Sequence, residues 1–158
     1  MWYGAYDGLH TIGLATSPDG IVWTKQNDGR SLPGLAGEQQ LGPTVYFDGS
    51  RYLMFYNTGA KVPTGGGIWT LFAATSDDGI TWQPVMDGRQ LLGPAPVGNF
   101  ASADGIIGNN HAVHPTKLIF AGGQVLIWYG GESNHARPGT RYGVSAIGLM
   151  GAKPGQVR

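Results

Sequence analysis

The chain has 158 residues, and its ten Lys and Arg residues are balanced by ten Asp and Glu residues. Only 13% of the residues are charged, and no block of like charge occurs, so nucleic acid and anionic membranes are not expected partners. The absence of Cys excludes disulfides, zinc–thiolate sites and thiol catalysis. The 28 Gly and 10 Pro residues, beside 41% apolar residues, favour one all-β domain of short strands and tight turns.

The first of three units, about residues 1–35, is expected to form three strands. These are predicted over Trp2–Ala5, Thr11–Ala15 and Val22–Lys25, where apolar and β-branched residues gather between turn residues. No helical period of apolar residues competes with this interpretation.

The second unit, about residues 36–95, is expected to form four strands. They are predicted near Thr44–Phe47, Tyr52–Tyr56, Thr70–Ala74 and Thr81–Pro84. The first two form a hairpin in PTVYFDGSRYLMFYNTG, where Asp-Gly marks the reversal.

The third unit, about residues 96–150, is expected to form three strands over Thr116–Phe120, Val125–Tyr129 and Tyr142–Ile147. Its first two strands form the hairpin PTKLIFAGGQVLIWYGG, with Gly-Gly at the reversal. Residues 151–158 are expected to be a tail.

An internal duplication links the first two units. ATSPDGIVW, from Ala15 to Trp23, recurs as ATSDDGITW, from Ala74 to Trp82, and Asp-Gly-Arg follows both copies. A repeat period of about 50–60 residues predicts the blades of a β-propeller. In each copy the Asp-Gly is expected to close a hairpin between the third and fourth strands. The Ser hydroxyl would bond within that turn, and the Trp would pack against the next blade.

The predicted fold is therefore a partial β-propeller of about 2.5 four-stranded antiparallel blades. Such a unit leaves sheet faces and strand edges uncovered, so we expect copies of the chain to close the ring as a homodimer or a higher oligomer, with C2 symmetry as the default. Two chains would supply five full blades, or six blades of which four are three-stranded. A fragment of a longer propeller and an open stack are the alternatives.

Three segments resemble the five-bladed β-propeller glycosidase superfamily, which includes arabinanases, β-xylosidases, invertases, levansucrases and the mannoside phosphorylases. They are GPTVYFDGSRYLMFY, IGLATSPDGIVW and HPTKLIFAGGQVLIWYGG. The resemblance covers most of the chain but about half of such a propeller. The repeated turn is also one residue shorter than the Asp-box of sialidases, so a sialidase-like six-bladed ring is the neighbouring possibility.

The resemblance implies glycan chemistry in a central funnel, performed by carboxylates on the innermost strands. In that superfamily an acidic residue stands directly before, or two before, the Pro that opens an inner strand. Here Leu41 and Gly42 precede Pro43, and Val113 and His114 precede Pro115. None of the superfamily's catalytic acids can be assigned.

Three other carboxylates are candidates for a relocated catalytic pair, which glycoside cleavage requires. Asp104 lies in the polar stretch before the inner strand of the third unit, Glu38 precedes the inner strand of the second unit, and Glu132 follows the Trp-Tyr pair of the third. Exposed loop carboxylates are more often solvated charges.

Ligand-binding candidates surround the same strand ends. The stretch SADGIIGNNHAVHPTK brings Asn109, Asn110, His111 and His114 to the predicted funnel. The two His are three residues apart and would point apart on an extended chain, so no metal site and no cofactor are expected.

The aromatic residues need a separate interpretation, since aromatic rings stack on sugars. Most of them fall at repeat-equivalent positions, where packing between blades is expected. Trp69 is the exception, because it follows a Gly-rich insertion, and it is a candidate for ligand contact.

These observations favour a soluble glycan-binding propeller module that lacks recognisable catalytic acids. The alternatives are a glycoside hydrolase with relocated carboxylates, and a non-functional propeller fragment that self-assembles. No signal peptide is visible and no apolar stretch approaches 18 residues, so the compartment stays open.

Overall fold

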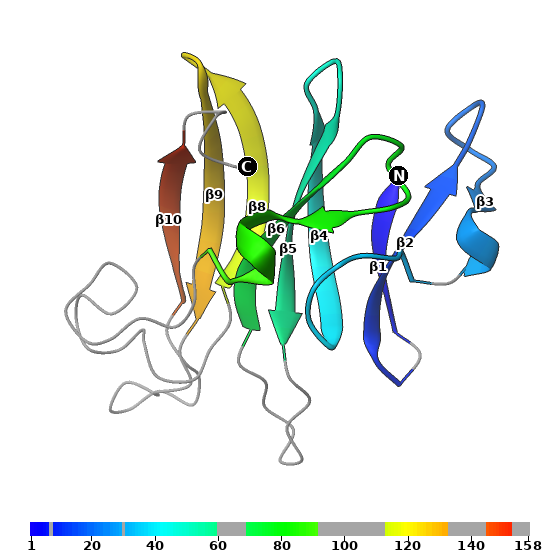
Figure 1. Ribbon diagram of the computed structural model, residues 1–158, viewed down its shortest axis with the longest axis horizontal. Coiled ribbons are helices and arrows are strands. Elements are labelled where there is room, and N and C mark those ends of the chain that lie inside the picture. Colours follow the sequence, from blue (N-terminus) through cyan, green and yellow to red (C-terminus); the bar gives the residue numbers. More distant parts are fainter. Residues whose placement is uncertain (7, 30, 60–68, 92–112, 133–144, 153–158) are drawn as a thin grey trace.

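The computed structural model describes residues 1–6, 8–29, 31–59, 69–91, 113–132 and 145–152. These residues form ten strands in three antiparallel sheets and include no α-helix, which confirms the predicted all-β class. The sheets hold three, four and three strands, in agreement with about 2.5 four-stranded units. They stand side by side, and the axes of their longer strands are roughly aligned (Figure 1). No helix in the described part of the chain is long and apolar enough to cross a membrane.

The first sheet has the order β1-β2-β3. Its strands are β1 (Trp2–Tyr6), β2 (His10–Thr16) and β3 (Thr24–Lys25), and the 3₁₀ turn η1 (Asn27–Gly29) follows. All three strands were expected at these places.

The middle sheet has the order β4-β5-β6-β7. Its strands are β4 (Gln39–Phe47), β5 (Tyr52–Gly59), β6 (Trp69–Ser76) and β7 (Gln83–Pro84), and the 3₁₀ turn η2 (Val85–Gly88) follows. This is the complete four-stranded unit that the sequence predicts.

The third sheet has the order β10-β9-β8, with β8 (Val113–Ala121), β9 (Gln124–Glu132) and β10 (Ser145–Ala152). The last strand ends later than predicted, and it enters the segment expected to be a tail; residues 142–144, where it was predicted to begin, lie outside the described residues. The strand ends later because it pairs with β9 as far as Ala152 opposite Val125, so the pairing extends almost to the β8–β9 turn.

The outer strands β3 and β7 are two residues long, shorter than expected. In the first sheet the backbone N–H groups of Ile21 and Val22 donate to Asp19 Oδ1 at 2.8 and 2.9 Å. Asp78 accepts the equivalent pair of bonds in the middle sheet. These amides are held by the turn and cannot join the ladder, so each outer strand starts only after the Trp.

The inner strand β4 starts five residues before its predicted beginning. The register with β5 shifts between Leu41 and Thr44, and Gly42 at this bulge has a φ of +61°. Gly-Pro usually marks a strand boundary, but a bulge lets the strand continue through it. β8 has a similar shift between Pro115 and Lys117.

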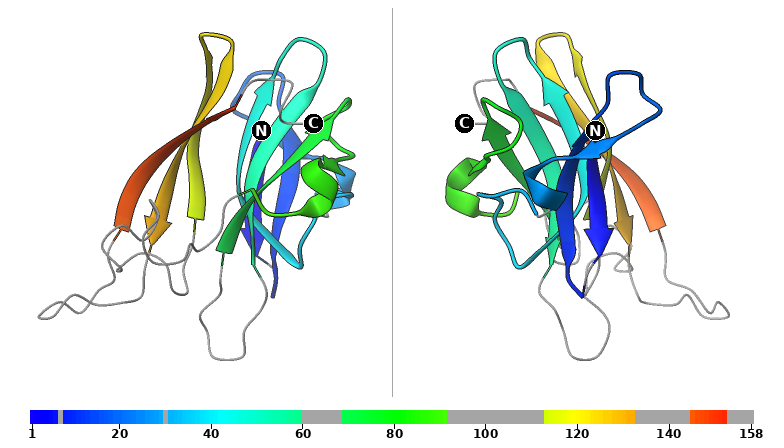
Figure 2. Two further views of the ribbon diagram at one scale, coloured as in Figure 1. Left: turned by 60° about the vertical axis from the view of Figure 1, so that its left-hand side comes forward. Right: turned by 90° about the vertical axis from the view of Figure 1, so that its right-hand side faces the viewer.

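Two apolar clusters hold the sheets together. One lies between the first two sheets, and its buried residues are Ile12, Leu14, Leu32, Met54, Tyr56, Ala74 and Trp82. The other lies between the middle and third sheets, and its buried residues are Phe55, Leu71, Ala73, Val85, Val125, Ile127 and Tyr129. Each sheet therefore packs through its face on the next, as Figure 2 shows from two further directions.

Candidate functional site

Trp69, one of the residues predicted to bind a ligand, begins β6 at the end of the middle sheet where β5 ends, the lower end in Figure 1. In the middle sheet, Gln39 pairs with Gly59 and Gly59 pairs with Trp69 at this end. In the first sheet the closing pair at the same end is Tyr6 with His10. The antiparallel order of the strands thus collects side chains from positions far apart in sequence.

An aromatic cluster of Tyr6, His10 and Trp69 bridges the first two sheets at this end. The ring centroids of Tyr6 and His10 are 4.8 Å apart, and those of His10 and Trp69 are 5.4 Å apart at an interplanar angle of 76°. Tyr6 is exposed, whereas His10 and Trp69 are half-buried. The cluster presents aromatic surface beside titratable and hydrogen-bonding nitrogen atoms.

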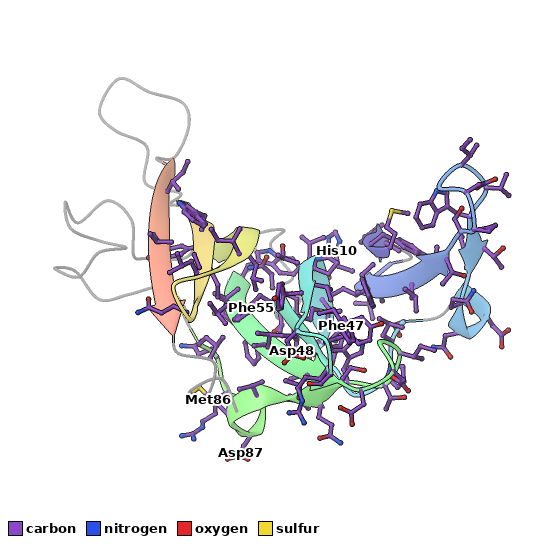
Figure 3. The ribbon with its side chains drawn as sticks, turned by 90° about the horizontal axis from the view of Figure 1, so that it is seen from above. His10, Phe47, Asp48, Phe55, Met86 and Asp87 are labelled. Atoms are coloured by element: carbon purple, nitrogen blue, oxygen red, sulfur yellow. The ribbon has the colours of Figure 1, made fainter. Side chains whose placement is uncertain are left out.

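The buried side chain of Gln39 supports this cluster from the middle sheet. Its Oε1 accepts a hydrogen bond from the backbone N–H of His10 at 3.4 Å. A buried amide that bonds to a neighbouring backbone limits the movement of both partners. In the view from above, along the strands, His10 lies away from Met86 and Asp87 (Figure 3).

Glu38 lies in the bend before β4, at the same end, and its side chain is exposed. The bend is held by Gln40, whose Nε2 donates to the carbonyl of Gly37 at 2.6 Å. Gly37 has a φ of +88°, and a side chain there would collide with Thr58. The backbone that carries Glu38 is therefore fixed, while its carboxylate faces solvent.

The other predicted site residues are placed only in part. His114, in β8, and Glu132, at the end of β9, belong to strands of the third sheet that end at this same edge of the molecule. Asp104, Asn109, Asn110 and His111 lie outside the described residues. Within the described ranges no three His, Asp or Glu side chains are grouped so as to hold a metal ion.

The two Asp-Gly turns lie at the opposite end, where the predicted serine bonds are confirmed. Ser76 Oγ donates to Asp78 Oδ1 at 2.9 Å and accepts from Gly79 N at 2.8 Å. Ser17 makes the same two bonds with Asp19 and Gly20. A pocket of about 190 Å³ beside the second turn is lined by Arg51, Thr75, Ser76, Asp77, Asp78, Thr81 and Gln83.

The predicted packing of the two repeat tryptophans is correct for one copy and wrong for the other. Trp82 is buried and lies edge-on to Trp2 of the first sheet, with ring centroids 6.3 Å apart. Trp23 is exposed, because none of the described sheets lies against its side of the first sheet. Trp2 and Tyr56 pack between sheets, as expected from their repeat positions.

Sequence reasoning missed His10 and Gln39. His10 directly follows the tight turn between the first two strands, and Gln39 lies just before the predicted start of an inner strand. Neither residue belongs to a motif, and the pairing of strand ends that brings them beside Tyr6 and Trp69 is a tertiary feature.

Comparison with known proteins identifies the fold. No protein-family model and no curated protein sequence matches the chain. Among solved structures, the chain is similar to a glycosyl hydrolase from Bacteroides ovatus, with a TM-score of 0.56 and 23% sequence identity. The match covers 94% of this chain and 42% of that one, so the chain spans less than half the length of the hydrolase. The chain therefore has a glycosidase-like fold.

Proposed function

We propose that the chain is a glycan-binding module built from adjacent blades of a β-propeller. The observation that carries this proposal is the aromatic cluster of Tyr6, His10 and Trp69, which joins the first two sheets at the end where β2, β4 and β6 begin. Sugar-binding sites combine an aromatic surface with a few fixed polar groups, and Gln39 and His10 supply the polar groups here.

The fold likeness supports the glycan as the ligand class. The similar solved structure is described as a glycosyl hydrolase, although its whole length is more than twice the matched part. A shared fold alone does not define an activity. The aromatic cluster therefore supports a binding site, and the fold likeness favours carbohydrate among the ligand classes.

Binding is favoured over hydrolysis because the inner strand β4, Gln39–Phe47, contains no carboxylate. The alternative is a hydrolase in which two of Glu38, Asp104 and Glu132 form the catalytic pair. A further alternative is a fragment without a ligand.

We also propose that copies of the chain assemble to close the ring, with residues 1–35, 36–95 and 96–150 as its three units per copy. A closed ring would surround the cluster with further strand ends and convert it into a funnel.

A binding experiment tests the proposed function. Titration of the wild-type chain with oligosaccharides selected on a glycan array should quench tryptophan fluorescence, and Trp69→Ala should weaken the affinity roughly tenfold or more, as for loss of an aromatic contact. Phe47→Ala is the matched control, since Phe47 is an exposed aromatic residue at the opposite end. Equal affinity of the two variants, or no binding of any glycan, would contradict the proposal.

Hydrolysis is tested separately with aryl glycosides. Turnover that is lost in two of the variants Glu38→Gln, Asp104→Asn and Glu132→Gln would establish the enzymatic alternative. Absence of turnover together with glycan binding is the result we expect.

A further inference from the structure

The two outermost sheet faces repeat, position by position, the faces that already pack against each other inside the chain. We call the face that a sheet turns toward the next sheet its leading face. In the first sheet the leading face consists of Trp2, Ile12 and Leu14, and in the middle sheet of Phe55, Leu71 and Ala73. The 59-residue offset relates Ile12 to Leu71 and Leu14 to Ala73, and the aromatic-Tyr pairs relate Trp2 to Phe55.

The third sheet has an equivalent leading face, on which Ile147 and Leu149 are exposed and Trp128 is half-buried. Trp128 opposes Leu149 across the ladder, as Phe55 opposes Ala73 in the middle sheet. By the same register Ile147 corresponds to Leu71. Ile147 is 76% exposed, whereas Leu71 is fully buried. Both residues are apolar, so residue type does not explain the difference: Leu71 packs against the third sheet, whereas none of the described sheets packs against Ile147.

The opposite face of a sheet, which receives the preceding sheet, is called here the trailing face. In the middle sheet it includes Met54, Ile80 and Trp82. The equivalent residues of the first sheet are Met1, Ile21 and Trp23. Ile21 is 82% exposed and Trp23 is 42% exposed, whereas Trp82 is 1% exposed.

In the repeated turn, the donor that bonds to the glycine carbonyl differs between the turn that a neighbouring sheet covers and the turn that is exposed. Where the first sheet packs on the middle one, Trp2 Nε1 donates to the carbonyl of Gly79 at 2.9 Å. Trp82 Nε1 then has no hydrogen-bond partner among the described residues. In the uncovered turn, Trp23 Nε1 instead donates to the equivalent carbonyl, that of Gly20, at 3.1 Å. An incoming indole would take over this carbonyl.

We propose that a second copy of the chain covers these faces by head-to-tail contact. The leading face of the third sheet of one copy packs on the trailing face of the first sheet of the other, with Trp128 over Gly20 as Trp2 lies over Gly79. Such a contact is heterologous, and two of them related by a two-fold axis close a ring of six sheets.

The repeat favours a second copy as the partner. The leading face of the third sheet resembles the faces that pack on a trailing face inside the chain, and the trailing face of the first sheet resembles the face that receives them. Two copies also approach the length of the glycosyl hydrolase, of which one copy spans 42%. This inference deepens the self-assembly of the proposed function and does not depend on a bound glycan.

Three variants of the full chain test the contact by sedimentation velocity at about 10–100 μM. The leading-face variant carries Ile147→Lys and Leu149→Lys, and the trailing-face variant carries Ile21→Lys and Trp23→Ala. Met86→Asn is the control, since Met86 is exposed outside both faces and its positive φ suits Asn. We expect the wild type and the control to be dimers. Each face variant should associate roughly ten-thousandfold more weakly, about tenfold for each of its two changed residues in each of the two contacts.

Mixing distinguishes this contact from a symmetric one. Each face variant retains the face that the other has lost, so the two together should form a one-to-one dimer through a single contact. A monomeric wild type, or a mixture that stays monomeric while the wild type dimerises, would overturn the proposal. If a face variant loses the far-ultraviolet circular dichroism of the wild type, Ile147→Ala and Ile21→Ala replace the lysine changes.

Trp128→Phe tests the hydrogen bond within the contact. It keeps an aromatic ring but removes the N–H donor, so we expect dimerisation to weaken roughly threefold to tenfold. An unchanged dissociation constant would contradict the placement of Trp128 over Gly20.

A wild-type monomer that still binds glycan would overturn only this inference, and a dimer that binds no glycan would overturn only the proposed function.

Discussion

At the scale of single residues, Asp78 shows how one side chain organises a whole turn. Its carboxylate accepts hydrogen bonds from the backbone N–H groups of Thr81 and Ile80 and from the hydroxyl of Ser76. These bonds favour the charged form and lower the pKa of Asp78 to about 2 from an ordinary value of 3.8. The bonds are made by an exposed carboxylate, so their effect is partly screened by solvent.

The lowered pKa of Asp78 predicts a specific pH dependence of stability. The folded state binds the proton less readily than the unfolded state, so the contribution of Asp78 is complete above pH 3.8 and is lost as the pH falls through about 2. Asp78→Asn should therefore be less stable than the wild type at pH 7, and the difference should disappear near pH 2. Urea unfolding across this range measures it, with Asp77→Asn as the control. A difference that is the same at pH 2 and pH 7 would contradict this assignment.

Gly34 is a second position where one residue type is required. It has a φ of +85°, and an added Cβ would overlap the carbonyl group of Trp82, whose N–H donates to Pro33 O at 3.0 Å. Gly49 also has a positive φ, +100°, but open space around it. Both Ala variants incur the strain of the left-handed backbone, about 1–2 kcal/mol, and only Gly34→Ala adds the collision.

We expect Gly34→Ala to lower the free energy of unfolding by roughly 1–3 kcal/mol more than Gly49→Ala does. Chemical denaturation of the two variants at equal protein concentration measures this difference. Equal stability of the two variants would show that the contact between the Pro33–Gly34 loop and Trp82 is looser than described.

At the scale of elements, the sequence predicts the existence and order of the strands well but places several of their ends wrongly. Strand cores such as Tyr52–Tyr56 follow from apolar and aromatic residues between turn residues. The ends depend on local hydrogen bonds, as at Ile21 and Val22, whose amides bond to Asp19 and not to a strand. The bulge at Gly42 likewise continues a strand that Gly-Pro would be expected to end.

The two repeat turns allow burial to be separated from hydrogen bonding. Ser17 and Ser76 make equivalent bonds, but Ser76 and its bond to Gly79 are buried, whereas the bond of Ser17 to Gly20 is exposed. Removing the hydroxyl of Ser76 leaves a buried N–H without its acceptor, whereas water can reach the N–H of Gly20.

We therefore expect Ser76→Ala to cost about 1–3 kcal/mol of unfolding free energy and Ser17→Ala to cost clearly less. Thermal or denaturant unfolding of the two variants measures the pair. A larger loss for Ser17→Ala would contradict the difference in burial between the turns.

At the scale of the whole molecule, the site depends on relations that a sequence does not state. Glu38 was predicted to precede the inner strand of the second unit and Trp69 to follow a Gly-rich insertion, and the structure places both at one end of the middle sheet. The contact of His10 with Trp69 arises from packing of one sheet on another, which no local pattern encodes. The same holds for Trp23 and Trp82, which are equivalent in the repeat but differ in burial because, among the described sheets, a neighbour lies against Trp82 alone.

The central claim is that the two outer sheet faces are incomplete interfaces which a second copy covers. The most direct test is the mass of the unsubstituted chain in solution, measured by sedimentation equilibrium over a wide range of protein concentration. We predict a species of twice the chain mass of 16.7 kDa, which dissociates on dilution. A monomer of 16.7 kDa that stays folded at every concentration would contradict the account.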